Sequence, residues 1–199
     1  MNPLVSLAKK TVETFIKDYN PPTTLPAFGR APGKIISPPN DLPKEFLERK
    51  AGTFVTIEKN GQLRGCIGTY LPLRKNIAEE IIYNAIAAAT EDYRFGPVQG
   101  EELPSLSYMV YILSEPELVK DISELDPKKY GIIVKTVPIS PTGDVVFNGH
   151  FVSKTGLLLP DLEGVDTIEK QISIACQKGG IDPLKEKILI YKFAVEKYK

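Results

Sequence analysis

The chain lacks several features that define specialised classes of protein. Its 199 residues include no Trp, one His and two Cys, and its 25 Lys+Arg balance 25 Asp+Glu. A single His without a Cys/His cluster argues against a zinc site, and we expect no other metal. Zero net charge removes the field that concentrates polyanions, so nucleic acid and acidic membranes are not expected partners. Dinucleotide, P-loop, HExxH and EF-hand motifs are missing too, so no cofactor is predicted.

Targeting and membrane signals are also missing. The first twenty residues carry Lys9, Lys10, Glu13 and Lys17 and no apolar core typical of a signal peptide. No run approaches the ~20 apolar residues that span a bilayer. The two cysteines form no CxxC pair. This pattern predicts a reduced, cytoplasmic protein.

The organisation along the chain predicts one domain over residues 1–199. Apolar residues at three- and four-residue steps predict an amphipathic helix over 3–20. Residues 21–43 hold seven of the 17 prolines and predict a strap laid over the surface. The remaining residues, 44–199, form the α+β body of the protein.

Hairpins dominate the β pattern of this body. Asn60-Gly61 between two β-rich runs, 53–59 and 62–70, predicts a two-residue turn, because both positions of that turn need positive φ. A mostly apolar helix is expected from 77 to about 93, and a second from 168 until Gly179-Gly180 ends it. Further strands are predicted at 106–113, 131–137, 144–152, 156–159 and 188–194. The order of elements favours an α+β fold with antiparallel or mixed sheets flanked by helices.

The stretch Arg64-Gly65-Cys66-Ile67-Gly68 is the most informative part of the sequence. Glycines weaken a strand, so two of them predict a bulge or the close approach of a ligand or of another backbone. Strand alternation places Arg64 and Cys66 on one face, where a guanidinium would favour the thiolate. Arg64 itself must be paired or line a cleft.

The hairpin register supplies a competing interpretation of Cys66. A two-residue turn at Asn60-Gly61 predicts that Cys66 lies opposite Val55 and Arg64 opposite Ile57. That face would be partly apolar, and a thiol buried there would be inert. The sequence leaves both interpretations open.

Asp92-Tyr93-Arg94-Phe95 follows the first buried helix and offers a second polar group of residues. Asp92 and Arg94 could form a pocket in which the guanidinium fork binds an anionic or amide-bearing ligand. In the alternative interpretation, Arg94 caps the last helical carbonyls and pairs with Asp92.

Three further residues carry groups capable of chemistry. His150 is the only imidazole, and sequence alone does not exclude its pairing with Cys66 in space. Cys176 falls on an apolar helix face and is expected in the core. Lys178 lies beside the glycines that end this helix, and helix termination accounts for them.

Taken together, these motifs resemble the AMMECR domain family over about Leu4 to Phe193. The hexapeptide Leu63-Arg64-Gly65-Cys66-Ile67-Gly68 is the most specific of them. The others are Phe54-Val55-Thr56, Asn84-Ala85, Ala87-Ala88, Asp92, Arg94-Phe95, Pro97, Glu102-Leu103, Leu113 to Glu117, Gly156 to Pro160, Cys176, Lys178, Gly180 and Tyr191-Lys192-Phe193. The chain departs from the family pattern at Gly179, where Ala is usual, and in a long 137–152 segment.

The resemblance implies two lobes around a cleft, with the RGCIG segment as the functional surface. The family's biochemical function is not established. Its prokaryotic members often occur beside Memo-type and radical S-adenosylmethionine proteins, which are the partners that the resemblance implies.

Two hypotheses therefore stand for the function. In the first, the chain is an accessory protein-binding module that docks to such partners. In the second, Cys66 is a nucleophile or redox thiol in a cleft where Arg64, Asp92 and Arg94 orient a small ligand. Both use the same candidate residues: Arg64, Gly65, Cys66, Gly68, Asp92, Arg94 and Phe95. The sequence does not decide between a monomer and a homodimer.

Overall fold

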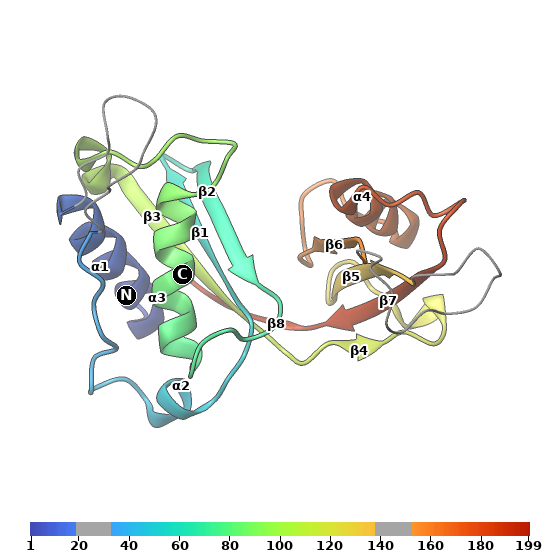
Figure 1. The fold of residues 1–199 in the computed structure, drawn as a ribbon, viewed down its shortest axis with the longest axis horizontal. Helices are drawn as coiled ribbons and strands as arrows, with labels where there is room; N and C mark the ends of the chain where they lie inside the picture. The colour runs from blue at the N-terminus through green and yellow to red at the C-terminus, as the bar shows by residue number, and fades with distance from the viewer. Residues whose placement is uncertain (19–32, 138–152) are drawn as a thin grey trace. The chain divides into compact units, whose positions relative to one another are not determined.

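The structure, a computed structural model, describes residues 1–18, 33–137 and 153–199. The chain forms two compact units (Figure 1). Unit 1 comprises Met1–Leu113 with Glu196–Lys199, and unit 2 comprises Ser114–Val195. Each unit has its own four-stranded sheet and its own helices. Within the described part of the chain, no helix is long and apolar enough to cross a membrane.

The sheet of unit 1 is built on the predicted hairpin. Its strands are β1 (Thr53–Lys59), β2 (Gln62–Thr69), β3 (Leu106–Leu113) and β8 (Val195–Tyr198), in the order β2-β1-β3-β8. Asn60 and Gly61 form the turn with φ of 53° and 78°. This positive-φ turn confirms the hairpin prediction.

Helices cover one face of this sheet. They are α1 (Pro3–Asp18) and α3 (Ile77–Thr90); the short helix α2 (Lys44–Glu48) packs on α3, and the 3-10 helix η1 (Gly100–Ser105) precedes β3. Helix α1 packs on α3 and β3, and α3 packs on β1 and β2 (Figure 1). The buried side chains on the helix side include Leu4, Val55, Ile57, Ile81 and Val110, which form the core of unit 1. The opposite face carries no helix from the described part of unit 1.

The boundaries of these elements differ slightly from the sequence predictions. Helix α3 ends at Thr90, before Tyr93, because Asp92 folds back to accept the backbone N–H of Arg94. Helix α1 ends at Asp18, and positions 19–20 of the predicted helix lie outside the described residues. In the predicted strap, residues 33–43 form no helix or strand, and 21–32 are not described.

The sheet of unit 2 has the order β4-β7-β5-β6. Its strands are β4 (Glu117–Leu118), β5 (Gly131–Thr136), β6 (Thr155–Leu158) and β7 (Ile188–Phe193), with the short 3-10 helix η2 at Ile122–Glu124. Helix α4 (Ile168–Gly179) packs on β5 and β6. Gly180 ends α4 at φ 61°, as predicted, and Cys176 is 2% exposed in the core. The predicted strand 144–152 lies outside the described residues.

The fold class is therefore α+β, with two four-stranded antiparallel sheets and helices.

Candidate functional site

A β-bulge at Arg64 sets the geometry of the candidate site. Leu63 pairs with Glu58 and Gly65 pairs with Ile57, so Arg64 is an extra residue in β2. The prediction that Cys66 lies opposite Val55 was therefore wrong, because the bulge shifts the register by one residue and Cys66 pairs with Thr56. The same shift removes the predicted pairing of Arg64 with Ile57. Cys66 consequently lies on the face without a helix, and Gly65 faces α3.

The two glycines of the motif allow close approach by other parts of the chain. A Cβ at Gly65 would lie 2.1 Å from the carbonyl oxygen of Ala88 in α3. A Cβ at Gly68 would lie 2.2 Å from the ring of Phe54 and 2.4 Å from the Thr53 carbonyl oxygen. The close approach that the glycines predicted is thus made by the backbone of α3 at Gly65, and by the ring of Phe54 and the backbone of β1 at Gly68.

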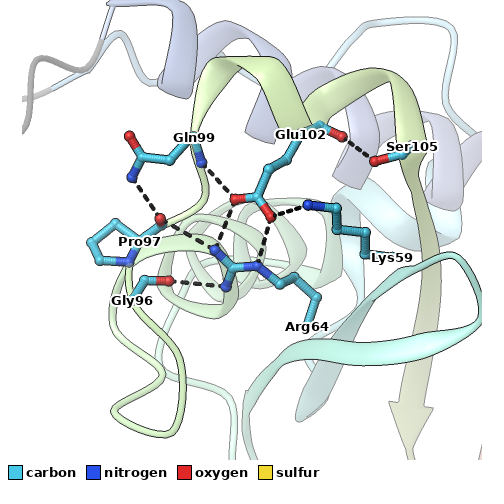
Figure 2. Close-up of polar contacts among 7 residues, drawn as sticks. All are labelled: Lys59, Arg64, Gly96, Pro97, Gln99, Glu102 and Ser105. Atoms are coloured by element: carbon cyan, nitrogen blue, oxygen red, sulfur yellow. Dashed lines mark hydrogen bonds and ion pairs between the residues drawn. The ribbon is translucent and has the colours of Figure 1, made fainter.

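Arg64 joins the bulge to the loop that follows α3 (Figure 2). Its Nε and Nη2 donate to the two oxygens of Glu102 at 3.0 and 2.9 Å. Its Nη1 donates to the Gly96 carbonyl at 2.9 Å, and Nη2 also donates to the Pro97 carbonyl at 3.2 Å. Four of the five N–H groups of this guanidinium are therefore engaged within the chain.

Glu102 is the centre of this cluster and had no predicted role. Besides Arg64, it accepts the Lys59 ammonium at 2.9 Å and the backbone N–H of Gln99 at 2.9 Å (Figure 2). The Arg64 guanidinium, assisted by Gln99 and Lys59, lowers the pKa of Glu102 to about 2 against the opposing effect of burial. The signal that could have found Glu102 was the need of a half-buried Arg64 for an anion.

Asp92 and Arg94 form a second ion pair beside β2. The Asp92 side chain is 4% exposed, and its Oδ1 and Oδ2 accept Nε and Nη2 of Arg94 at 2.9 and 2.7 Å. Asp92 Oδ2 also accepts the backbone N–H of Cys66 at 2.9 Å, and Arg94 Nη2 reaches the Cys66 carbonyl at 3.5 Å. The hydrogen bonds from Arg94 lower the pKa of Asp92 to about 2, and Asp92 in turn raises the pKa of Arg94.

This pair takes the place of a neighbouring strand at the edge of the sheet. Strand β2 is an edge strand, and both backbone groups of Cys66 that point away from β1 meet the Asp92–Arg94 pair. Of the two sequence interpretations, the pairing of Arg94 with Asp92 is found. Within the described residues, Arg94 donates to no carbonyl of α3.

Cys66 is half-buried, and its thiol is held from β1. The Thr56 hydroxyl donates to Cys66 Sγ at 3.2 Å. The same sheet face presents the half-buried side chains of Phe54, Met109 and Tyr111. His150 lies outside the described residues, so its pairing with Cys66 stays a prediction.

Phe95 completes the group. The guanidinium carbons of Arg64 and Arg94 lie 6.0 and 5.5 Å from the centroid of its ring. Residues Arg64, Cys66, Asp92, Arg94 and Phe95 thus gather beside the N-terminal half of β2, and we call them the β2 edge site. Among the described residues, no group of three or more His, Cys, Asp or Glu side chains is placed to hold a metal ion.

Comparison with known proteins identifies the family. The AMMECR1 family matches residues 5–198. The chain belongs to the AMMECR1 family. A Thermotoga maritima protein is 52% identical over 168 residues, which cover 84% of this chain and 88% of the relative. The Clostridium acetobutylicum protein CA_C1420 is 41% identical over 198 residues, but the match spans only 36% of its length.

A solved AMMECR1-family structure supports the fold. The crystal structure of the uncharacterized protein PH0010 from Pyrococcus horikoshii is similar with a TM-score of 0.75 at 31% sequence identity. The similarity covers 98% of this chain and 88% of PH0010. This chain and PH0010 therefore share the α+β architecture over nearly the whole of this chain.

In this AMMECR1-family chain, two sets of polar groups stay available at the β2 edge site: the backbone of the adjoining Gly68 and the Arg94 guanidinium. Cys66 and Gly68 have the same parity in β2, so the N–H and C=O of Gly68 also point away from β1. Among the described residues they have no hydrogen-bond partner. The Arg94 side chain is 45% exposed, and its Nη1 donates no hydrogen bond within the same residues.

Proposed function

We propose that this chain is a non-catalytic accessory module that binds a protein partner through the β2 edge site and the adjoining sheet face. The observation that carries the proposal is the engagement of the charged residues. Arg64 and Glu102 are bonded to each other and to the chain's own backbone, and Asp92 is bonded to Arg94 and to the Cys66 backbone, whereas the outward groups of Gly68 and Arg94 Nη1 are available. Because the Asp92–Arg94 pair already occupies the outward backbone groups of Cys66, a partner would contact β2 through the Gly68 backbone and the Arg94 guanidinium.

The electrostatics weigh against proton transfer at Cys66. An efficient general base has a pKa near the working pH. The carboxyl groups of the site, Asp92 and Glu102, have pKa values of about 2, because arginines hold both in the ionised form. Neither carboxylate is basic enough to deprotonate a thiol efficiently at neutral pH.

The sheet face beside the edge supplies apolar and aromatic contact area. Phe54, Met109 and Tyr111 are half-buried on this face, and aromatic and Met side chains are enriched at protein interfaces. The Arg94 guanidinium lies near the Phe95 ring in the β2 edge site. Arginine and aromatic side chains are the residue types that most often dominate binding energy.

For the partners we propose the Memo-type and radical S-adenosylmethionine proteins that the AMMECR resemblance implies. The full chain would be titrated by calorimetry with each of these proteins from its own source, comparing the native chain with Arg94→Ala and Tyr111→Ala. Lys170→Ala, an exposed position on α4 of unit 2, serves as the control. We expect each site variant to weaken binding at least tenfold and Lys170→Ala to leave it unchanged. Absence of binding to both proteins, or equal binding by all variants, would refute the proposal.

One observation favours a second candidate, thiol chemistry at Cys66. The Thr56 hydroxyl donates to Sγ, a contact that stabilises a thiolate, and the Arg94 cation lies beside the Cys66 backbone. In this alternative, Arg64, Asp92 and Arg94 orient an anionic or amide-bearing ligand. Alkylation with iodoacetamide across a pH series, with Cys176 as internal control, tests it. Reaction well below the usual thiol pKa of about 8.5, lost in Thr56→Val, would support it, and reaction only on unfolding would end it.

A further inference from the structure

A hollow in unit 1 lies where α3 begins and shares no residue with the β2 edge site. Its volume is about 620 Å³, and three cationic residues line it: Lys50, Arg74 and Lys75. The single acidic residue in its lining is Glu79. No ion pair joins the three cations to a carboxylate in the described chain, and residues 19–32, which precede Gly33, contain no Asp or Glu. We call this hollow the Arg74 pocket.

A buried carboxylate fixes the loop that carries two of these cations. Glu80 is 1% exposed, and its Oε2 accepts the backbone N–H groups of Leu73 and Arg74, both at 2.8 Å. Its Oε1 accepts the Thr69 hydroxyl at 2.6 Å. The loop between β2 and α3 is therefore anchored at Leu73 and Arg74 to the interior of unit 1.

The anchored loop displays an apolar residue next to its charges. Leu73 is 72% exposed, and Leu71 on the same loop is 47% exposed. Ile35, which lines the pocket, is 45% exposed. Fixed aliphatic side chains beside unpaired cations are typical of a surface that another protein covers.

The Arg74 guanidinium is already oriented. Its central carbon lies 3.6 Å from the centroid of the Tyr83 ring, so the guanidinium is stacked on the ring. A stacked guanidinium keeps its N–H groups free at its rim for a carboxylate. The stacking also covers one face of Tyr83, the only aromatic ring among the described residues that line the pocket, which disfavours a nucleobase as the occupant. Three cations disfavour a metal ion.

We propose that the Arg74 pocket binds an acidic segment of a partner protein, with carboxylates on Lys50, Arg74 and Lys75 and an aliphatic side chain against Leu73. The charge of the pocket and its exposed aliphatic rim carry this assignment. The surface is separate from the β2 edge site, so the proposal stands or falls independently of the proposed function.

The test uses the full chain labelled with ¹⁵N and a defined probe. The probe is an acetylated, amidated Glu-Leu-Glu-Glu-Leu-Glu peptide, compared with its Lys-for-Glu counterpart and with inorganic phosphate at equal concentration and ionic strength. We expect the acidic peptide to shift the amide signals of Leu73, Arg74 and Lys75. Its affinity should fall at least tenfold in the double variant R74E/K75E and at least threefold in Leu73→Ala. The matched control Lys170→Glu, a charge reversal on α4, should leave it unchanged.

The outcomes separate the alternatives. Equal shifts by the acidic and basic peptides, or acidic-peptide binding unchanged in R74E/K75E, would overturn the proposal. Phosphate that produces the same shifts with the same affinity would assign the pocket to a small anion and overturn the protein partner. Concentration-dependent broadening of the same signals without probe would identify a second copy as the occupant, which also overturns it. Glu80→Gln, which weakens the loop anchor, should reduce peptide affinity. The amide signals of the β2 edge site should keep their native positions in this variant.

Discussion

The two units pack a helix against their sheet in the same way. In each unit an α-helix crosses a four-stranded sheet at a strand glycine, and the helix presents an alanine there. A Cβ on Gly65 in unit 1 would lie 2.1 Å from the Ala88 carbonyl oxygen, and one on Gly156 in unit 2 would lie 1.8 Å from the Ala175 carbonyl oxygen. The backbones of helix and strand are thus in direct contact in both units.

The units differ in how they use charge. In unit 1 the acidic partners Asp92 and Glu102 are 4% and 14% exposed, and each binds backbone N–H groups as well as an arginine. In unit 2 the pairs Lys128–Asp166 and Lys185–Asp182 are largely exposed, and the more buried Lys192–Glu124 pair still has side chains 17% and 33% exposed. Exposed pairs contribute little to stability, whereas buried pairs fix the groups that they contact. The comparison indicates that charge in unit 1 is used to position the edge of β2.

The largest expected effect is a test of the shared helix contact. We expect Gly65→Ala and Gly156→Ala each to lower the free energy of unfolding by about 3 kcal/mol, because the added methyl group meets a backbone carbonyl that cannot turn away. Urea denaturation followed by circular dichroism measures this loss.

Gly100→Ala is the matched control, since a Cβ there has no atom within 4 Å and the φ of Gly100 is not positive. It should change the stability by less than about 0.5 kcal/mol. Gly65→Ala and Gly156→Ala with stabilities equal to that of Gly100→Ala would contradict the close backbone contact.

The second test measures how much stability the buried carboxylates of unit 1 contribute. The folded-state pKa values of Asp92 and Glu102 are about 2, below their ordinary values of 3.8 and 4.5. On acidification the unfolded chain therefore binds these protons first. The stability that the two groups contribute, on the order of 2 kcal/mol each, is complete above about pH 5 and is lost as the pH falls toward 2.

Glu102→Gln isolates one of these groups. We expect it to cost about 2 kcal/mol at pH 7 and to flatten the decline of stability below pH 5, because one of the two groups no longer titrates. Denaturant midpoints of the native and variant chains at several pH values measure both effects. Lys185→Ala, which breaks an exposed pair in unit 2, should leave the profile unchanged. Parallel pH profiles for the native chain and Glu102→Gln would show that Glu102 is not a buried partner.

Local signals in the sequence were sufficient for most of the fold. Asn60-Gly61 requires positive φ, so the hairpin could be predicted, and the apolar spacing of α1 and α3 gave the buried faces of both helices. The two glycines of β2 predicted a bulge or a close approach, and the structure has both, but they did not give the position of the bulge at Arg64 or the register beyond it. Arg64 at the bulge pairs with Glu102, which lies 38 residues away in the chain, and no local pattern encodes that contact.

At the candidate site, too, the sequence predicted the residues but not their contacts. The sequence pointed to Arg64, Asp92 and Arg94 as charged groups that need partners, and the structure supplies the partners. Their partners are largely backbone groups: Asp92 accepts the N–H of Cys66, and Arg64 donates to the carbonyls of Gly96 and Pro97. Backbone partners carry no residue signature, so the role of these side chains in supporting an edge becomes visible only in three dimensions.

A smaller effect comes from a buried oxygen in unit 2. Gln171 is fully buried, its Nε2 donates to the Tyr130 carbonyl at 2.7 Å, and its Oε1 has no partner within the described residues. Gln171→Met loses the donor and leaves the Tyr130 carbonyl unpaired, so we expect a loss of about 1 kcal/mol. Thermal unfolding compared with Gln177→Met, an exposed position on the same helix, checks this. An increase in stability would mean that the unpaired Oε1 outweighs the bond to Tyr130.

Unit 1 also contains a buried oxygen without a partner, but there we expect the substitution to raise the stability. The hydroxyl of Tyr108 on β3 is buried without a hydrogen-bond partner in the described part of the chain, and burial strongly raises the pKa of Tyr108. Unlike Gln171, Tyr108 has no bond to lose, so Tyr108→Phe removes only an unsatisfied polar group. We therefore expect unfolding to become harder by about 0.5–1 kcal/mol, measured by the same thermal unfolding. Tyr111→Phe, on the opposite face of β3, is the control, because its hydroxyl contacts Met109 Sδ at 3.8 Å. A Tyr108→Phe chain less stable than this control would show that the Tyr108 hydroxyl is bonded after all.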